Sequence, residues 1–312
     1  EAKYIRINEQ VPRPWATRRR WGGDGYDQQH VVITKDTNLG LKAQHGIVPI
    51  EKDGSAHFLV PADKNIFFQV LDENYMELQR ERTFVNYRPG ETRSCIGCHE
   101  TPTDTPVNAR TTPLAMRRKA SLPGPQPGEK TGARPLYYAT DVQPVLDKHC
   151  VKCHSGDTPK GGLVLTGDMT GLFSVSYEKL IPERRRGRGR KGTDLIGPTI
   201  GENHPKTGNV HYLPAKSLGS HASVIAAMLN PGKIQIKDQK MAELAKTLTP
   251  VHKNVTLSKE EMVRLTTWID SNGQYYGAWW GRRNLRYKEH PNFRPVPTFA
   301  TATSMVSPIP EA

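Results

Sequence analysis

The stretch DVQPVLDKHCVKCH, residues 141–154, ends in the pattern CxxCH, and residues 95–99, CIGCH, repeat that pattern. Together the two copies contain every cysteine of the chain: Cys95, Cys98, Cys150 and Cys153. CxxCH is the attachment pattern of c-type haem. Two thiols three residues apart reach the two vinyl groups of one porphyrin, and the next histidine then lies below the iron as its proximal ligand. The sequence therefore predicts two covalently bound haem c groups, haem 1 on His99 and haem 2 on His154.

A zinc site is the main alternative for cysteines and histidines in such a pattern. Zinc pairs, however, usually occur as CxxC followed at a distance by a second CxxC or HxxxH, and here neither CxxCH needs the other. The spacing favours haem.

Two helices are predicted on either side of the second haem-binding domain. Asp141 is expected to be the N-cap of a helix whose apolar residues Val142, Val145 and Leu146 lead into Cys150. A later helix begins at Ser258, where Ser-Lys-Glu-Glu forms a capping box, and stops at Gly273.

By composition, the chain divides into four parts. Because the first part is predicted to be β and the haem 2 domain mostly α, the sequence predicts an α+β protein. Residues 1–90 contain short β-branched runs between turn signals, among them 30–34, 46–50, 56–60 and 65–71, and predict an antiparallel β-sandwich. Residues 91–135 predict an extended tether carrying haem 1, with an interdomain boundary at 121–129. Residues 136–281 form the haem 2 domain, with long irregular connections, and 282–312 a Pro-rich tail.

The order of features in 136–281 resembles the class I cytochrome c plan. There a first helix ends in CxxCH, and the distal ligand lies about six positions before the cap of the last helix. That position is His252, which the resemblance makes the sixth ligand of haem 2, with His221 and His211 as runners-up and an exposed loop histidine as the alternative. His221 is expected to open a helix over 222–229 and to pack near the haem or its propionates. His149 is expected to be a capping or surface residue.

Several segments closely resemble the C-terminal half of hydrazine synthase alpha subunits and related planctomycete-type multihaem proteins. The segments are GSAHFLVPAD from 54, FQVLDEN from 68, GETRSCIGCHE from 90, KGGLVL from 160, GSH from 219 and LTTWID from 265. The resemblance spans residues 40–281.

The resemblance implies a reactive upstream haem, a downstream bis-histidine haem that relays electrons, and an extracytoplasmic, periplasmic-type location. The family's reactive haem is ligated by a tyrosine four residues after the CxxCH histidine; Thr103 stands at that position here, so His99 is expected to be an ordinary proximal ligand. The family's β-propeller has no repeat trace in this chain.

Three hypotheses of function follow. The first is a dihaem cytochrome that transfers electrons between redox partners within a larger assembly. The second is a redox enzyme subunit related to hydrazine synthase alpha, in which haem 1 keeps an open iron position for substrate. In the third, the β-domain and the Pro-rich segment 291–310 dock the cytochrome to other subunits. The sixth ligand of haem 1 stays open among the following residues: His30, His45, His57, His204, His211, or a group from another subunit.

The formal net charge of +13 favours acidic redox partners. The basic run 184–191 is expected to be a solvated loop, with docking of such a partner as the second reading and RNA binding as the least favoured one. No nucleic-acid partner is predicted. No apolar run approaches the 18 residues of a membrane span. The aromatic residues Tyr275, Tyr276, Trp279 and Trp280 are expected to be core or interface packing.

Overall fold

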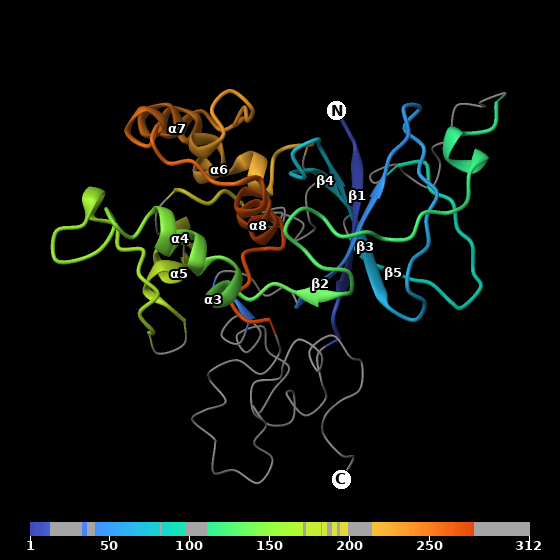
Figure 1. Ribbon diagram of the computed structural model, residues 1–312, viewed down its shortest axis with the longest axis horizontal. Coiled ribbons are helices and arrows are strands. Elements are labelled where there is room, and N and C mark those ends of the chain that lie inside the picture. The colour runs from blue at the N-terminus through green and yellow to red at the C-terminus, as the bar shows by residue number, and fades with distance from the viewer. Residues whose placement is uncertain are drawn as a thin grey trace, which may run out of the picture.

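A sheet and a group of helices lie side by side in the computed structural model, with helix α8 between them (Figure 1). The structure describes residues 1–12, 33–35, 41–81, 83–97, 111–170, 173–181, 183–185, 189–191, 194–198 and 214–277. The predicted α+β composition is confirmed. Trp279, Trp280, the Pro-rich tail, and the histidines at 30, 99, 204 and 211 lie outside the described residues.

The sheet has six strands, paired antiparallel in the order β4-β3-β1-β2-β6, and β5 also pairs with β3. The strands are β1 (Tyr4–Gln10), β2 (Lys42–Pro49), β3 (Asn65–Leu71), β4 (Glu77–Arg80), β5 (Val85–Asn86) and β6 (Arg134–Pro135). The predicted run 65–71 is β3 itself. The run 46–50 falls mostly in β2, whereas 56–60 forms only the isolated bridge between Phe58 and Ser121.

The second sheet of the predicted sandwich is not found among the described residues, where a helix covers the sheet instead. The reason lies in β1, whose alternate residues Arg6 and Asn8 are buried although they are polar. Arg6 Nη2 donates to Thr267 Oγ1 of α8 (3.0 Å), and its guanidinium lies 3.8 Å from the Asp270 carboxylate. A buried cation needs polar partners, and α8 provides them where an apolar second sheet would not.

Besides the sheet, the described residues contain six α-helices, three short 3₁₀ turns and a two-stranded hairpin. The α-helices are α3 (Tyr138–Asp141), α4 (Gln143–His149), α5 (Val175–Leu180), α6 (Val224–Leu229), α7 (Gln239–Val251) and α8 (Lys259–Asp270). The 3₁₀ turns are η1 (Leu114–Arg117), η2 (Lys160–Gly162) and η3 (Gly219–Ala222), and the hairpin strands are β7 (Glu183–Arg185) and β8 (Gly189–Lys191). None of the described helices is long and apolar enough to cross a membrane.

The largest core cluster joins α3, α4, α5, α6 and α8 around the fully buried Trp268. Tyr138 and Tyr177 contact the Trp268 ring, with centroids 5.1 and 6.4 Å away. Tyr275 and Tyr276 belong to the same cluster, so the core-packing prediction is confirmed for these two residues.

The predicted helix termini are partly correct. Ser258 caps α8 with the full capping box, and Gly273 follows the helix with a φ of 59°. The Asp141 prediction is wrong: α4 begins after Val142, and Asp141 ends α3 instead. Its carboxylate accepts from the backbone N–H of Tyr137 (2.7 Å). Tyr137 is the N-cap of α3, and the N–H groups at the start of a helix have no acceptor within the helix, so a side chain can bind them.

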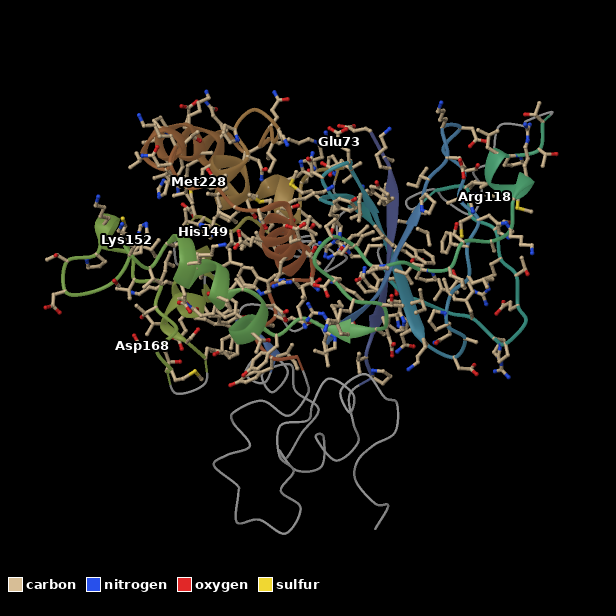
Figure 2. All side chains as sticks on the ribbon, viewed as in Figure 1. Glu73, Arg118, His149, Lys152, Asp168 and Met228 are labelled. Carbon is tan, nitrogen blue, oxygen red and sulfur yellow. The ribbon has the colours of Figure 1, made fainter. Side chains whose placement is uncertain are left out.

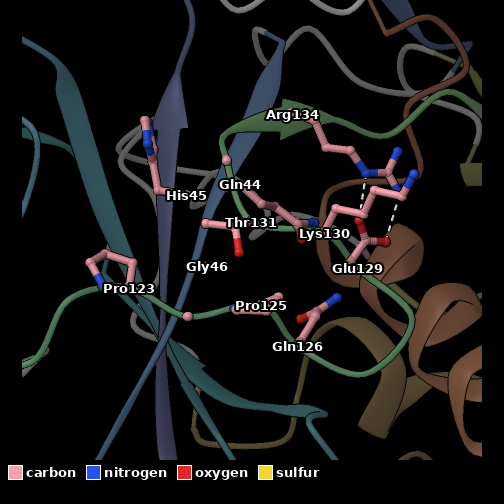
Figure 3. Close-up of a pocket in the computed structure, with 12 residues that line it drawn as sticks. Gln44, His45, Gly46, Pro123, Pro125, Gln126, Glu129, Lys130, Thr131 and Arg134 are labelled. Atoms are coloured by element: carbon pink, nitrogen blue, oxygen red, sulfur yellow. Dashed lines mark hydrogen bonds and ion pairs between the residues drawn. The ribbon is translucent and has the colours of Figure 1, made fainter.

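Residues 121–129, the predicted interdomain boundary, cross the sheet in contact with it. Ile47 and Gly124 exchange backbone hydrogen bonds, and a Cβ on Gly46 would lie 2.4 Å from the Gly124 carbonyl oxygen. Figure 3 shows the hollow beside this crossing, closed on one side by the Glu129–Arg134 ion pair. The division into domains remains a prediction.

Candidate functional site

The second CxxCH continues the last turn of α4. Cys150 N–H donates to Leu146 O (2.7 Å), and the amides of Cys153 and His154 both donate to Cys150 O (3.0 Å each). One helical turn thus holds the three residues of the motif. Cys150 packs against the core, and burial raises the pKa of its thiol to about 11, with Cys153 as the second cause. Cys153 is exposed.

The structure brings His154 and His252 together. Their imidazole rings have centroids 6.1 Å apart and planes within 6° of parallel. His154 Nδ1 lies 3.2 Å from Leu163 O, and His252 Nδ1 lies 2.8 Å from Leu248 O. A carbonyl can only accept, so both Nδ1 atoms carry hydrogen in these bonds. Each ring is therefore left with Nε2 as its free lone pair, as a metal-ligating histidine requires.

The separation of the rings fits one iron between them. Two metal–nitrogen bonds of about 2 Å, with about 1.1 Å from each nitrogen to its ring centre, predict a centroid distance of about 6.2 Å. Rings in direct face-to-face contact would lie at about 3.5–4 Å. The donor set, two imidazoles with two cysteines one turn apart, fits a covalently attached haem with bis-histidine ligation.

Helix α7 delivers His252, and the sequence interpretation did not include this helix. Asp238 is its N-cap, accepting from Met241 N–H (2.9 Å), and His252 is its C-cap residue. The backbone N–H of His252 donates to the carbonyls of Leu248 and Thr249. The Asp-Gln-Lys-Met start is the signal that could have located it. The predicted helix over 222–229 appears as η3 followed by α6.

A charged cluster joins α4 to the beginning of α8. Glu261 accepts from Lys148 Nζ (2.8 Å), and His149 Nε2 lies 3.0 Å from its other oxygen. Hydrogen bonds from Lys148, from the Ser258 amide and from His149 lower the pKa of Glu261 to about 2. His149 thus pairs with the capping residue of α8, and the helix that carries the second motif is fixed at its C-terminal end.

His221 is buried beside the sheet. It is 2% exposed, and its Nε2 lies 3.1 Å from Asp72 Oδ2 in the turn after β3. Its Nδ1 has no hydrogen-bond partner among the described residues. A contact of His221 with haem or propionates stays a prediction.

The first motif is described only up to Gly97, so Cys98, His99 and Thr103 lie outside the described residues. Cys95 is exposed. Arg93 lies over the Tyr87 ring, 5.4 Å from its centroid. Burial, with Cys95 as a smaller cause, raises the pKa of Tyr87 to about 12. Tyr87 therefore lies close enough to this motif for Cys95 to affect its pKa.

Two of the histidines considered for haem 1 are described. His45 Nε2 lies 2.8 Å from Glu9 Oε2, so that this ring is already paired. His57 has a buried Nδ1 without a hydrogen-bond partner in the described part of the chain. Over the same residues, no three His, Cys, Asp or Glu side chains form a cluster that could hold a metal ion by themselves. The His154–His252 pair is a two-ligand arrangement.

Comparison with known proteins gives one family. Residues 1–100 match the family described as the hydrazine synthase alpha subunit middle domain. The hydrazine synthase subunit alpha of Kuenenia stuttgartiensis is 24% identical over 261 residues, covering 65% of this chain and 32% of that protein. The solved hydrazine synthase of the same organism matches with a TM-score of 0.62 and 18% identity, over 88% of this chain and 39% of the other.

These likenesses confirm part of the resemblance predicted from sequence. The chain is similar to hydrazine synthase alpha subunits and shares the fold of the solved one. The family match begins at residue 1, whereas the predicted resemblance began at 40. The chain spans about a third of the length of the curated relative. The resemblance to class I cytochrome c remains a prediction.

Proposed function

We propose that this protein is a redox enzyme subunit related to hydrazine synthase alpha. In this proposal the second CxxCH carries a bis-histidine haem suited to electron transfer, and the first CxxCH carries a haem with an iron position open to a small substrate. The likeness to hydrazine synthase supports the enzyme assignment. The 6.1 Å separation of the His154 and His252 rings is the observation that carries the second site.

The residues of the second site prepare it for electron transfer. Haem iron supplies reversible one-electron oxidation and reduction. Leu163 O and Leu248 O hold the two rings in one tautomer and one orientation, so both ligands are in place in either oxidation state. Ligation from both sides leaves no position for substrate, which assigns any substrate chemistry to the first site.

The dihaem electron carrier, the first hypothesis from sequence, differs from this proposal only at haem 1. In the electron carrier, the iron of haem 1 would also have six ligands. The curated relative favours the enzyme, because it is named as a subunit of a synthase. Because the name describes a subunit, it also supports other subunits as partners. The extracytoplasmic location in this proposal rests on the haem c predicted from the two CxxCH motifs.

Low-temperature EPR of the oxidised full chain, after its mass has established two haems, tests the proposal. We expect one low-spin and one high-spin signal, and carbon monoxide binding by the reduced protein. Two low-spin signals with no carbon monoxide binding would overturn the enzyme assignment. His252→Ala should convert the low-spin signal to high-spin, whereas His149→Ala, at the residue directly before Cys150, should not. An unchanged spectrum in His252→Ala would remove His252 as the ligand.

A further inference from the structure

The edge of the second site carries three lysines, at positions 152, 160 and 253. Lys152 precedes the exposed Cys153, and Figure 2 shows it at the outer end of the molecule, away from the sheet. The Lys160 amide donates to Cys153 O (3.0 Å). Lys253 follows His252, whose ring faces His154 at 6.1 Å. Each of the three lysines is therefore next to Cys153 or His252, in sequence or through a backbone hydrogen bond, and the Cys153 side chain is exposed.

These lysines are exposed, and no described carboxylate forms an ion pair with any of them. The nearby acids Glu243 and Glu261 are paired with other lysines, at 2.8 Å in both cases. Asp157 is the exposed acid on the same loop. These three lysines and this aspartate together carry a charge of +2.

An exposed apolar residue also borders this site. Val251, the last residue of α7, is 73% exposed and directly precedes His252. Electron-transfer partners bind through small contacts in which a charged rim orients the encounter and speeds it. A rim of unpaired cations beside an apolar residue and an exposed thioether position is complementary to a carboxylate-rich surface.

We propose that this lysine rim, defined by Lys152, Lys160 and Lys253 beside Cys153 and Val251, docks an acidic redox protein that exchanges electrons with haem 2. The inference rests on the proposed function, because it requires haem at the second motif. In this inference, haem 2 exchanges electrons at the end of the molecule that carries Lys152, away from the sheet (Figure 2).

Stopped-flow oxidation of the reduced full-length protein tests the lysine rim with two small reagents of opposite charge. In each reaction one electron leaves ferrous haem 2 and reduces hexacyanoferrate(III) or hexaammineruthenium(III). At low ionic strength, Lys152→Gln, Lys160→Gln and Lys253→Gln together should slow the anionic reagent about tenfold and should not slow the cationic one. A matched control, Lys52→Gln, Lys119→Gln and Lys130→Gln, removes the same charge from exposed positions in the sheet part and should slow it less than twofold.

A decaglutamate peptide then stands in for the acidic partner. It should slow the anionic reagent in the wild type and in the control, and have no effect on the rim variant. Equal rates in the two triple variants would overturn the inference, because net charge alone would then explain the effect. Lys160→Glu, which is not adjacent to a ligand or a cysteine, replaces the triple variant if that protein loses its low-spin signal. Absence of haem from Cys150 and Cys153 by mass would instead refute the proposed function, and the rim with it.

Discussion

Asp270→Asn should destabilise the whole protein, because the carboxylate of Asp270 holds the sheet against α8. Asp270 Oδ1 accepts from Ser220 N–H (2.7 Å), and Oδ2 accepts from Glu77 N–H (3.1 Å) and lies 3.8 Å from Arg6. An amide nitrogen at either place would leave a buried N–H without an acceptor, and Arg6 would lose its nearest buried anion. Such losses cost about 3–5 kcal/mol when one partner of a buried pair is removed.

Urea unfolding followed by circular dichroism measures this effect as a fall in the free energy of unfolding. Glu73→Gln is the control, since it also removes one negative charge but from an exposed residue in the turn after β3 (Figure 2), and it should change stability by less than about 0.5 kcal/mol. A loss under about 1 kcal/mol for Asp270→Asn, or unfolding of the helices with the sheet intact, would refute the reasoning.

Three further predictions concern the haem 2 ligand His252, the cap of α8 and the half-buried acid Glu81. His252→Met should raise the potential of haem 2 and keep it low-spin, which redox titration and EPR measure; a lower potential would contradict bis-histidine ligation. Ser258→Ala should cost about 1 kcal/mol in urea unfolding, because it removes the acceptor for the Glu261 amide (3.2 Å), and no change would show that the capping box is redundant. Burial raises the pKa of Glu81 to about 6, so ionisation of this acid should destabilise the fold as pH rises from about 4 to 6. Glu81→Gln, which can still accept from Phe68 N–H, should therefore gain stability relative to wild type at pH 8 and not at pH 4; equal differences at both values would contradict the raised pKa.

Local signals made part of this fold predictable from sequence. The α8 capping box depends on Ser258 and Glu261, three residues apart, and β3 on one β-branched and aromatic run between two turns. Both were located correctly because nothing distant decides them. β1 was not singled out, because Arg6 and Asn8 on one of its faces are polar, as on a solvated strand. Partners of Arg6 that are distant in sequence, among them Thr267 of α8, 261 residues away, and Gln126, 120 residues away, help to make that face buried.

For the second candidate site, the sequence identified Cys150, Cys153 and His154 from the motif, and His252 from its place ahead of the last helix. The structure brings the two histidines together, and their role as haem ligands stays a prediction. The structure adds α7, whose C-cap residue is His252. The bond between His252 Nδ1 and Leu248 O leaves Nε2 as the free ring nitrogen. The surroundings of His221 could not be predicted, because its partner Asp72 comes from the sheet, 149 residues earlier. For the first site, the sequence offers several histidines without a local signal to choose among them.

The contacts between sheet and helices imply that the ligand geometry of the second site depends on the sheet. Asp270 accepts from Ser220 at the start of η3, and a Cβ on Gly219 would lie 2.3 Å from Asp270 Oδ1, so η3 and α8 have no room to shift against each other. η3 leads into α6, and α6 carries α7, which ends at His252. Glu77 of the sheet donates its amide to the same Asp270. A change at Asp270 should therefore loosen the His252 side of the pair before the His154 side, because α4 is held separately by Glu261, and the low-spin EPR signal of Asp270→Asn should broaden at urea concentrations below the unfolding transition.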